Sequence, residues 1–332
     1  MDGLVGTATG VFRIVHGTPG QTLACRNVRD IQDLGVALYA GSAAGVHRSR
    51  DGGCSWEPCG LGEREVWQIR AAPDGMLLAV TQPAGLFRSA DGGDSWTEVE
   101  ALTAVPDADS WCVPIEPPLP GRARALVIDA TDPARLWVGV EVGGILSSRD
   151  AGASWQLVRP GGNPDIHVLV AHPGCADELY VSTGYGRPDG IAPMVEGNAG
   201  VFRSTDGGQS WHYVWAGITP RYTRPMCIDP RPPHPLTVAC APSPFSVFTD
   251  EGGAGAMLFR SDDRGGHWRS LGDAAHTPST ANFHGLTPAG DECGSVLVGT
   301  DTGELWRVSA AGEWRLLVSG LPAVLSVLDR TA

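Results

Sequence analysis

RSRDGGCSW at residues 48–56 is one of five similar segments spread along the chain. The others are RSADGGDSW at 88–96, SSRDAGASW at 147–155, RSTDGGQSW at 203–211 and the more divergent RSDDRGGHW at 260–268. All but the last follow the pattern Ser-x-Asp-x-Gly-x-Ser-Trp. Recurrence at intervals of tens of residues indicates a fold assembled from similar supersecondary units.

Each of these segments is predicted to form a tight turn between two antiparallel strands. The short Asp side chain accepts hydrogen bonds from backbone N–H groups of its own turn, and Gly adopts the positive φ that the turn requires. The Trp then starts the outgoing strand and packs its indole between neighbouring sheets. Because turns on separate hairpins lie far apart, we expect their carboxylates to be structural and not a catalytic array. They are Asp51, Asp91, Asp150, Asp206 and Asp263.

Short apolar runs around each turn predict four strands per repeat. One run precedes the turn directly, as in LLAVTQPAGLFRS at 77–89, and another lies further upstream, as in VWQIRAAPDG at 66–75. Segments at 4–17 and 297–314 keep this frame without the Asp. An aromatic or equivalent residue marks the third strand of each unit, at Phe12, His47, Phe87, Leu146, Phe202, Phe259 and Trp306. Seven marks give units of about 47 residues, the size of a propeller blade.

The sequence therefore predicts an all-β protein, a seven-bladed β-propeller of four-stranded antiparallel blades that occupies residues 1–332 as a single domain. The chain starts at the second strand of a blade, LVGT at 4–7, and ends with the apolar run AVLSVL at 323–328. We expect this C-terminal run to pair beside residues 4–7 as the missing inner strand. Such pairing closes the ring and removes its exposed sheet edges.

The repeated segment resembles the Asp-box, or BNR, repeat of bacterial sialidases, xyloglucanases, sortilin-type receptors and a photosystem II assembly propeller. The resemblance covers nearly the whole chain and implies a propeller fold, with a glycosidase-like hydrolase or an assembly factor among the implied functions. It does not single out one activity, because fold alone does not give function. The segment FRI at 12–14 is followed by Val15 and not by the Pro of the sialidase motif, and it lies on a predicted third strand.

Composition excludes some classes of function. The formal net charge of −13 is opposite to what nucleic-acid phosphates require, so we expect no nucleic-acid partner. No run of about eighteen apolar residues is present, so no membrane span is predicted. The N-terminal sequence lacks the pattern of a signal peptide, and we expect a cytoplasmic protein. The eight cysteines show no metal-binding spacing and indicate no disulfide framework.

The candidate site is predicted on the face opposite the Asp-box turns. The long insertions, at 101–121, 184–199, 243–256 and 272–282, all fall in loops of that face, and variable loops on a rigid frame commonly carry function. Alignment of the inner strands brings polar and aromatic residues to the points where these strands begin, although apolar residues would suffice for packing. They are Glu65, Trp67, Arg122, Arg124, Asp165, His167, Tyr222, Arg224, Asn282 and His284, with Arg29 from a shortened blade and Glu141, Tyr185, Arg187 and Asp301 from adjacent loop positions.

The leading hypothesis is that the central funnel binds, and transforms, a small anionic or polar molecule, including a carbohydrate-like one. Guanidinium groups bind carboxylates and phosphates with paired hydrogen bonds, so Arg122, Arg124, Arg187 and Arg224 are the predicted anchors, with Trp67, Tyr185, Tyr222 and Asn282 as further contacts. His167 and His284 are the predicted acid–base residues, because imidazole titrates near neutral pH. Glu141 and Asp165 are the predicted catalytic carboxylates, as in a glycosidase pair.

Three alternatives stay open at the level of sequence. His167, His284 and Asp301 include the donor types of a divalent metal site, which would make the protein a metal-dependent lyase or hydrolase. A non-catalytic scaffold could instead dock a protein partner on the insertions. The polar inner residues could also face only water in a wide channel. A buried polar cluster favours the enzyme, and an exposed apolar rim favours the scaffold.

Overall fold

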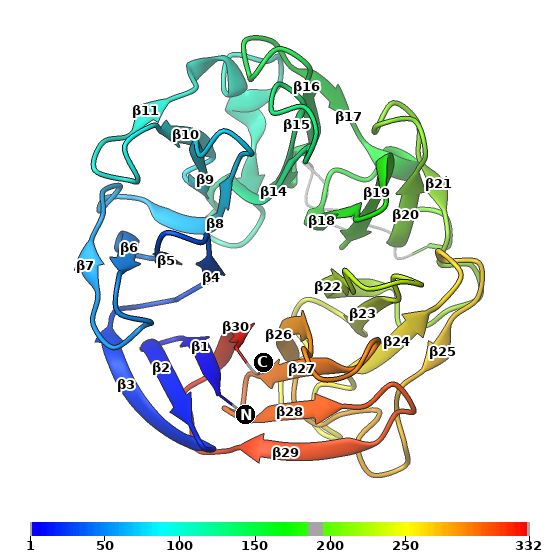
Figure 1. The fold of residues 1–332 in the computed structure, drawn as a ribbon. Coiled ribbons are helices and arrows are strands. Elements are labelled where there is room, and N and C mark those ends of the chain that lie inside the picture. The colour runs from blue at the N-terminus through cyan, green and yellow to red at the C-terminus, as the bar shows by residue number, and fades with distance from the viewer. Residues whose placement is uncertain (1, 185–194, 331–332) are drawn as a thin grey trace.

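The computed structural model describes residues 2–184 and 195–330, and it arranges them as a ring of β-sheets around a central axis (Figure 1). Seven of the sheets have four strands, and in each of them neighbouring strands are antiparallel. The predicted seven-bladed, four-stranded β-propeller is confirmed.

The strands of the seven blades, each blade given from the inner strand outward, have the following bounds. The blade that closes the ring consists of β30 (Val324–Asp329), β1 (Gly3–Thr7), β2 (Gly10–Val15) and β3 (Thr18–Ala24). The next three blades consist of β4 (Asp30–Asp33), β5 (Leu38–Ser42), β6 (Gly45–Ser49) and β7 (Glu57–Pro58); of β8 (Glu65–Ala71), β9 (Leu77–Gln82), β10 (Gly85–Ser89) and β11 (Thr97–Glu98); and of β14 (Arg122–Ile128), β15 (Leu136–Glu141), β16 (Gly144–Ser148) and β17 (Gln156–Val158). The last three consist of β18 (Ile166–His172), β19 (Cys175–Thr183), β20 (Gly200–Ser204) and β21 (His212–Tyr213); of β22 (Tyr222–Ile228), β23 (Leu236–Ala241), β24 (Met257–Ser261) and β25 (Arg269–Ser270); and of β26 (Phe283–Pro288), β27 (Val296–Thr300), β28 (Leu305–Val308) and β29 (Trp314–Val318).

The ring is closed by strands from the two ends of the chain, as the sequence predicted. Strand β30 pairs antiparallel with β1, with Gly3 opposite Asp329 and Thr7 opposite Val324. Ser326 also donates a hydrogen bond from Oγ to the carbonyl oxygen of Val28 in the next blade, at 3.1 Å. The blade that begins the chain therefore receives its innermost strand from the last residues (Figure 1).

Apolar packing holds each blade to the next. Seven clusters of buried side chains lie at the seven interfaces between adjacent blades. In one of them, Val80 and Leu86 of one blade pack on Leu126 and Val138 of its neighbour, and all four are at most 1% exposed. Strand residues alternate between the two faces of a sheet, so each blade can fill the interface on both of its sides.

The Asp-box turns have the predicted hydrogen bonds. In the fourth box, one oxygen of Asp206 accepts from the backbone N–H groups of Gln209 and Ser210, both at 3.0 Å. Ser204 is fully buried, donates to Asp206 at 2.8 Å, and accepts from the N–H of Gly208 at 2.8 Å. The buried member of the motif is thus the first Ser, whereas the carboxylate lies nearer to solvent.

The box tryptophans join neighbouring blades, although their indoles are only partly buried. Trp96 donates from Nε1 to the carbonyl oxygen of Cys59 in the preceding blade, at 2.8 Å, and Trp268 donates likewise to Val214 at 2.6 Å. Trp56 reaches Thr22 at 3.2 Å. Each box joins the third strand of its blade to the fourth, so the boxes lie on the outer part of one face of the ring, which we call the box face.

The boxes are expected to make the fold sensitive to acid. Hydrogen bonds from Ser95 and Ser89 lower the pKa of Asp91 from 3.8 to about 2, and the pKa of Asp206 falls to about 2 because its hydrogen bonds outweigh burial. Between the folded-state pKa of about 2 and the ordinary value of 3.8, the unfolded chain binds more protons than the folded one. The stability that these carboxylates contribute is therefore complete above about pH 5 and is lost as the pH falls through about 2. We expect the melting temperature, followed by circular dichroism, to drop in this window.

Replacement of the carboxylates provides the control for this expectation. A double variant Asp91→Asn, Asp206→Asn should melt at a lower temperature at neutral pH, but its melting temperature should fall less steeply between pH 5 and 2. An acid profile parallel to that of the wild type would show that other carboxylates govern the acid unfolding.

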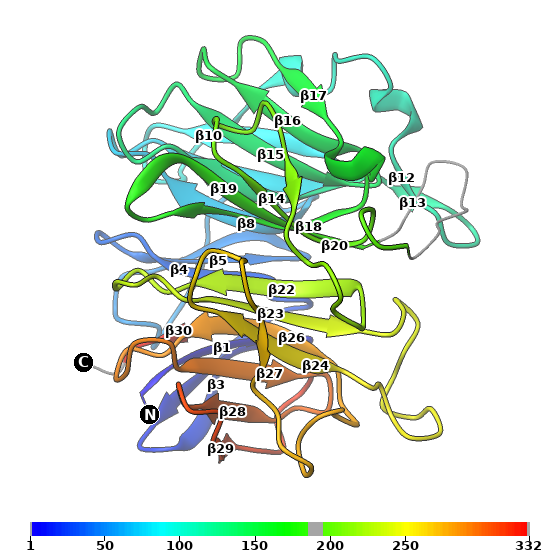
Figure 2. The same cartoon turned by 90° about the vertical axis from the view of Figure 1, so that its right-hand side faces the viewer.

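The opposite face, which we call the loop face, carries the insertions at 101–121, 243–256 and 272–282, whereas most of the insertion at 184–199 is outside the described residues. A two-stranded hairpin, β12 (Cys112–Val113) with β13 (Leu119–Pro120), stands out from the ring between β11 and β14 (Figure 2). Three short 3-10 segments lie at Glu100–Leu102, Ala108–Ser110 and Pro160–Gly162. All eight cysteines are free thiols. Over the described part of the chain, none of the helices has the length and apolarity to cross a membrane.

Candidate functional site

A cavity of about 930 Å³ lies on the ring axis, between the inner strands. Most of the residues predicted for the site line it, and they come from β8, β14, β18, β22 and β26 and from the end of β15. They are Trp67, Arg122, Arg124, Glu141, Asp165, His167, Tyr222, Arg224 and His284, and Arg29 before β4 joins them. The inner strands all begin at the loop face, so the first residues of several blades share this end of the cavity.

Three predicted site residues in the described part of the chain do not line the cavity: Glu65, Asn282 and Asp301. Asn282 is buried and donates from Nδ2 to the carbonyl oxygen of Ser246, so it holds the 243–256 loop. Asp301 accepts from the backbone N–H of Asn282 at 2.9 Å, and burial raises its pKa. Tyr185 and Arg187 lie outside the described residues.

Glu141 is clamped between two arginines. Arg122 binds it in a bidentate manner through Nε and Nη2, and Arg124 binds it through Nη1 at 2.5 Å. Burial acts to raise the pKa of Glu141, but the charges of Arg124 and Arg122 outweigh burial and hold the pKa well below its ordinary value. Glu141 is therefore a fixed negative charge, and it is poorly suited to donate a proton.

Asp165, His167 and Tyr222 form a hydrogen-bonded group beside Glu141. His167 Nδ1 lies 2.5 Å from the carbonyl oxygen of Thr223, which can only accept, so Nδ1 carries a proton. In the neutral ring Nε2 then has the free lone pair, and the Tyr222 hydroxyl lies 3.2 Å from it. Asp165 Oδ1 lies 3.3 Å from the same Nε2. The Asp165 carboxylate and the Tyr222 hydroxyl therefore both lie at the Nε2 side of the imidazole.

Residues that sequence reasoning did not single out hold this group in place. Asn163 is buried, accepts from the N–H of Asp165 at 2.9 Å, and donates to the carbonyl oxygen of Gly184 at 2.6 Å. Gly184 has no side chain because a Cβ there would clash with Asp165 and would lie 2.7 Å from ring carbons of both His167 and Tyr222. Asn163 could have been suspected from the sequence because it is two residues from Asp165. Gly184 could not, because only the fold brings it next to Asp165.

Trp67 is surrounded by guanidinium groups. The Cζ atoms of Arg29, Arg122 and Arg124 lie 4.3, 4.7 and 5.0 Å from the centroid of its ring. Such cation–π contacts restrain the guanidinium groups over the indole ring, and they are stronger where water is excluded. Arg29 also donates to Glu65 at 2.8 Å. Trp67 is thus a support for the arginines as well as a wall of the cavity.

His284 and Arg224 lie next to each other in the ring of inner strands. Burial, together with the charges of Arg224, Arg29 and Arg124, lowers the pKa of His284 to about 3. His284 is therefore neutral over the physiological range and can act as a hydrogen-bond partner, but it is a poor proton donor. Arg224 donates to the carbonyl oxygens of Ser243 and Pro244, at 3.4 and 3.1 Å, and so contacts the 243–256 loop.

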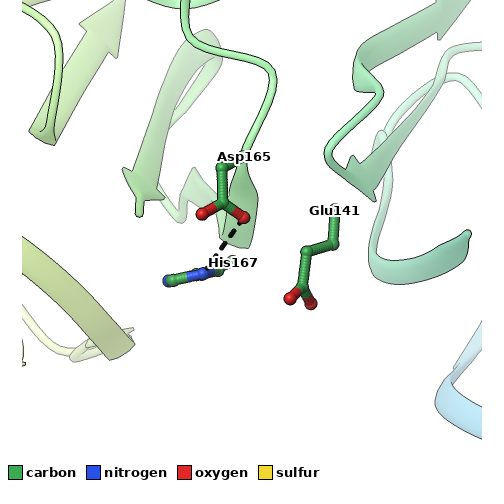
Figure 3. A group of neighbouring side chains, drawn as sticks. All are labelled: Glu141, Asp165 and His167. Atoms are coloured by element: carbon green, nitrogen blue, oxygen red, sulfur yellow. Dashed lines mark ion pairs between the residues drawn. The ribbon is translucent and has the colours of Figure 1, made fainter. Parts of the chain in front are cut away.

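The group of residues with metal-ligand spacing differs from the set that the sequence suggested. One ligand atom from each of Glu141, Asp165 and His167 lies within 4.8 Å of the others (Figure 3). His284 and Asp301 are not part of this group. Both oxygens of Glu141 are already bound to arginines, and the surrounding positive charge opposes a cation. The donor set is therefore a poor fit to a divalent metal ion.

The fold and the cavity define the class: a seven-bladed β-propeller built from Asp-box repeats, with a charged cavity on its axis. The BNR/Asp-box repeat family matches residues 202–213, which contain the whole of the fourth box. No curated protein matches the chain in sequence.

Solved structures with the same fold include two glycoside hydrolases of family GH74. The xyloglucanase from Xanthomonas campestris is 21% identical with a TM-score of 0.72, and the match covers 96% of this chain and 53% of the xyloglucanase. The enzyme from Niastella koreensis is 15% identical with a TM-score of 0.64, and the match covers 96% of this chain and 47% of that one. The chain thus spans about half the length of these enzymes.

YCF48 bound to a D1 peptide also shares the fold. It is 17% identical with a TM-score of 0.56, and the match covers 94% of this chain and 82% of YCF48. At these levels of identity the matches establish the shared propeller architecture. They include glycosidases and a protein with a bound peptide, so the choice of function depends on the site.

Proposed function

We propose that the protein binds a small anionic or polar molecule at the loop-face end of the axial cavity and transfers a proton to or from it through His167. The observation that carries the proposal is the convergence, in one cavity, of arginines and of the Asp165–His167–Tyr222 group from separate blades. Core packing does not require such residues there, because each charged group removed from water is costly.

The electrostatics of this end favour an anion over a cation. Four arginines, Arg29, Arg122, Arg124 and Arg224, line it, and the carboxylates described beside them are Glu65, Glu141 and Asp165. Because water is partly excluded, a carboxylate or phosphate of the ligand gains charge-assisted hydrogen bonds that are stronger than those in water. A bound anion would add a fourth negative charge and so balance the four arginines.

The chemistry supported by the site is general acid–base transfer of a hydrolase or lyase type. His167 Nε2 faces Asp165 and Tyr222, and its orientation is set by the Thr223 carbonyl. Burial and the charges of Asp165 and Glu141 raise the pKa of Tyr222, so its hydroxyl stays protonated. A sugar acid or sugar phosphate is the ligand class we consider first, because the fold is shared with xyloglucanases.

The test uses three probes that differ only in their anionic group: glucuronate, glucose 6-phosphate and glucose. By titration calorimetry we expect at least one anionic sugar to bind more tightly than glucose. Arg124→Gln should weaken that binding by about 10- to 100-fold, the scale of a charge-assisted hydrogen bond. Arg315→Gln, on outer strand β29, changes the net charge equally and should have no effect.

Turnover is measured with 4-nitrophenyl β-glucuronide, and with the β-glucoside as the neutral analogue. His167→Gln should reduce turnover by about a hundredfold or more while changing glucuronate affinity much less, because a proton-transfer group contributes mainly to the rate. If no probe binds and the arginine variant behaves as the wild type does, the cavity is only a water-filled channel.

A protein-docking function is the second candidate, because apolar side chains are exposed on the loop face. Ile115 and Leu119 of the hairpin are 44% and 41% exposed, and Phe245 and Phe248 of the 243–256 loop are 74% and 50% exposed. Exposed apolar groups at a rim are typical of interaction sites. The fold is also that of YCF48, which has been solved with a bound peptide. This candidate takes precedence if the sugar probes do not bind.

A further inference from the structure

We infer that the ligand of the cavity is an anionic amphiphile, with its charged head at the arginines and an apolar tail directed along the axis toward the box face. The inference rests on the proposed function and narrows its ligand class. It starts from the part of the cavity that lies beyond the charged residues, because the same cavity continues along the inner strands past the arginines.

One side of the cavity is an apolar wall. Strands β18, β22, β26 and β30 contribute Val168, Val170, Ile228, Leu286 and Leu325, all of which line the cavity and are only half-buried. Inner-strand residues that pack between blades are buried much more completely, as Leu169 at 2% and Ile69 at 0% exposure show. Val168, Val170, Ile228 and Leu286 pack in part against the clusters between blades, and the surface that they leave uncovered is presented to the cavity.

The opposite side of the cavity is polar, and several of its polar groups are paired within the protein. Gln68 accepts from the N–H of Leu126 at 2.8 Å. Gln32 and Arg70 both donate to Asp30, at 2.8 and 2.9 Å. These contacts use part of the hydrogen-bonding capacity of this side of the cavity. A hydrocarbon chain or ring lying against the apolar wall suits this part of the cavity better than a polyhydroxylated extension does.

The dimensions suit a medium-length tail. Val170 follows His167 by three residues in β18, and Ile228 follows Arg224 by four residues in β22. At about 3.3 Å per residue, the wall extends roughly 10–13 Å beyond the charged end. The tail would be enclosed by inner strands there, whereas Ile115 and Phe245 at the loop-face opening are exposed to solvent. Burial of apolar surface is therefore larger in the interior.

The test compares acetate, butyrate, hexanoate and octanoate by titration calorimetry, with octan-1-ol as the uncharged analogue. We expect the affinity to rise by about tenfold for each two methylene groups, somewhat below the full gain for complete burial. Octanoate should bind more tightly than octan-1-ol, and Arg124→Gln should remove that difference. Equal affinity across the carboxylate series would overturn the inference.

Paired variants locate the tail. Ile228→Asn and Leu286→Asn should abolish the dependence on chain length while leaving glucuronate binding unchanged. Ile115→Asn and Phe245→Asn, the matched changes at the opening, should preserve that dependence. If the opening variants lose it and the wall variants keep it, the tail lies at the rim and the inference is wrong. Ile228→Ala and Leu286→Ala, which keep an apolar wall, replace the Asn variants if those unfold, and they should reduce octanoate affinity by about tenfold.

The same measurements separate the proposed function from the amphiphile inference. If glucuronate or glucose 6-phosphate binds but chain length has no effect, the proposed function stands and the amphiphile inference fails. If none of the anionic probes, from acetate to octanoate and the two sugars, binds at the arginines, the proposed function fails as well.

Discussion

Removal of residues 321–332 is expected to unfold most of the protein at room temperature. The deletion takes away the inner strand β30, and with it the buried side chains of Leu321, Val324 and Val327. At about 2 kcal/mol for each buried side chain, the loss is roughly 6 kcal/mol before the β1–β30 ladder is counted. A whole domain has a stability of about 5–15 kcal/mol, so the ring cannot absorb such a loss.

Thermal unfolding followed by circular dichroism measures this effect. Addition of a synthetic peptide of residues 321–332 should restore the melting transition in a concentration-dependent manner, because the peptide can pair with β1. A peptide of the same composition in scrambled order is the control. A truncated protein that melts within a few degrees of the full chain would show that ring closure does not need β30.

Replacement of Glu141 is expected to lower stability and, at the same time, to strengthen anion binding. Glu141→Gln removes the charge that neutralises Arg122 and Arg124 in a buried position. Breaking a buried ion pair in this way costs about 3 kcal/mol, because the remaining charges stay out of water. The same arginines then attract an external anion more strongly, and we expect glucuronate affinity to rise by about tenfold.

Chemical denaturation and calorimetry provide the two measurements. Glu65→Gln is the matched control, because Glu65 also pairs with an arginine but is more exposed, at 21% against 7% for Glu141. Its cost should stay below about 1 kcal/mol, as for other partly exposed pairs. Loss of glucuronate binding in Glu141→Gln would mean that Glu141 itself contacts the ligand, and its role as a fixed counter-charge would be wrong.

The architecture could be predicted because it depends on short sequence patterns that recur along the chain. Each box combines an Asp, a Gly and a Trp at fixed spacing, and this turn chemistry depends on nearest neighbours alone. The marks at Phe12, His47 and Leu146 lie on the third strands β2, β6 and β16 as expected, and Phe12 does so in a blade that has no box. The strand count left the first blade without an inner strand and left one apolar run at the C-terminal end without a blade. The pairing of β30 with β1, which closes the ring, was therefore also predictable.

The candidate site could be predicted only in part. Inner-strand alignment identified Arg122, Arg124, His167 and Arg224 as residues of one ring, because equivalent positions in equivalent blades point to the same axis. Asn282 was aligned in the same way, but its side chain turns to the carbonyl of Ser246 in the 243–256 loop and does not line the cavity. A loop of irregular sequence has no repeat to align, so its contacts were not predictable.

The sequence by itself determined the number of blades, the position of the turns, the closure of the ring and the face that carries the charged residues, because all of these depend on local periodicity and turn chemistry. Only the tertiary structure decided which charges neutralise one another. The clamp of Arg122 and Arg124 on Glu141, the orientation of His167 by Thr223, and the space that Gly184 leaves for Asp165 join residues 17 to 56 positions apart. Such pairings depend on side-chain geometry within a blade, and for His167 and Thr223 across a blade interface, and no pattern of spacing along the chain encodes that geometry.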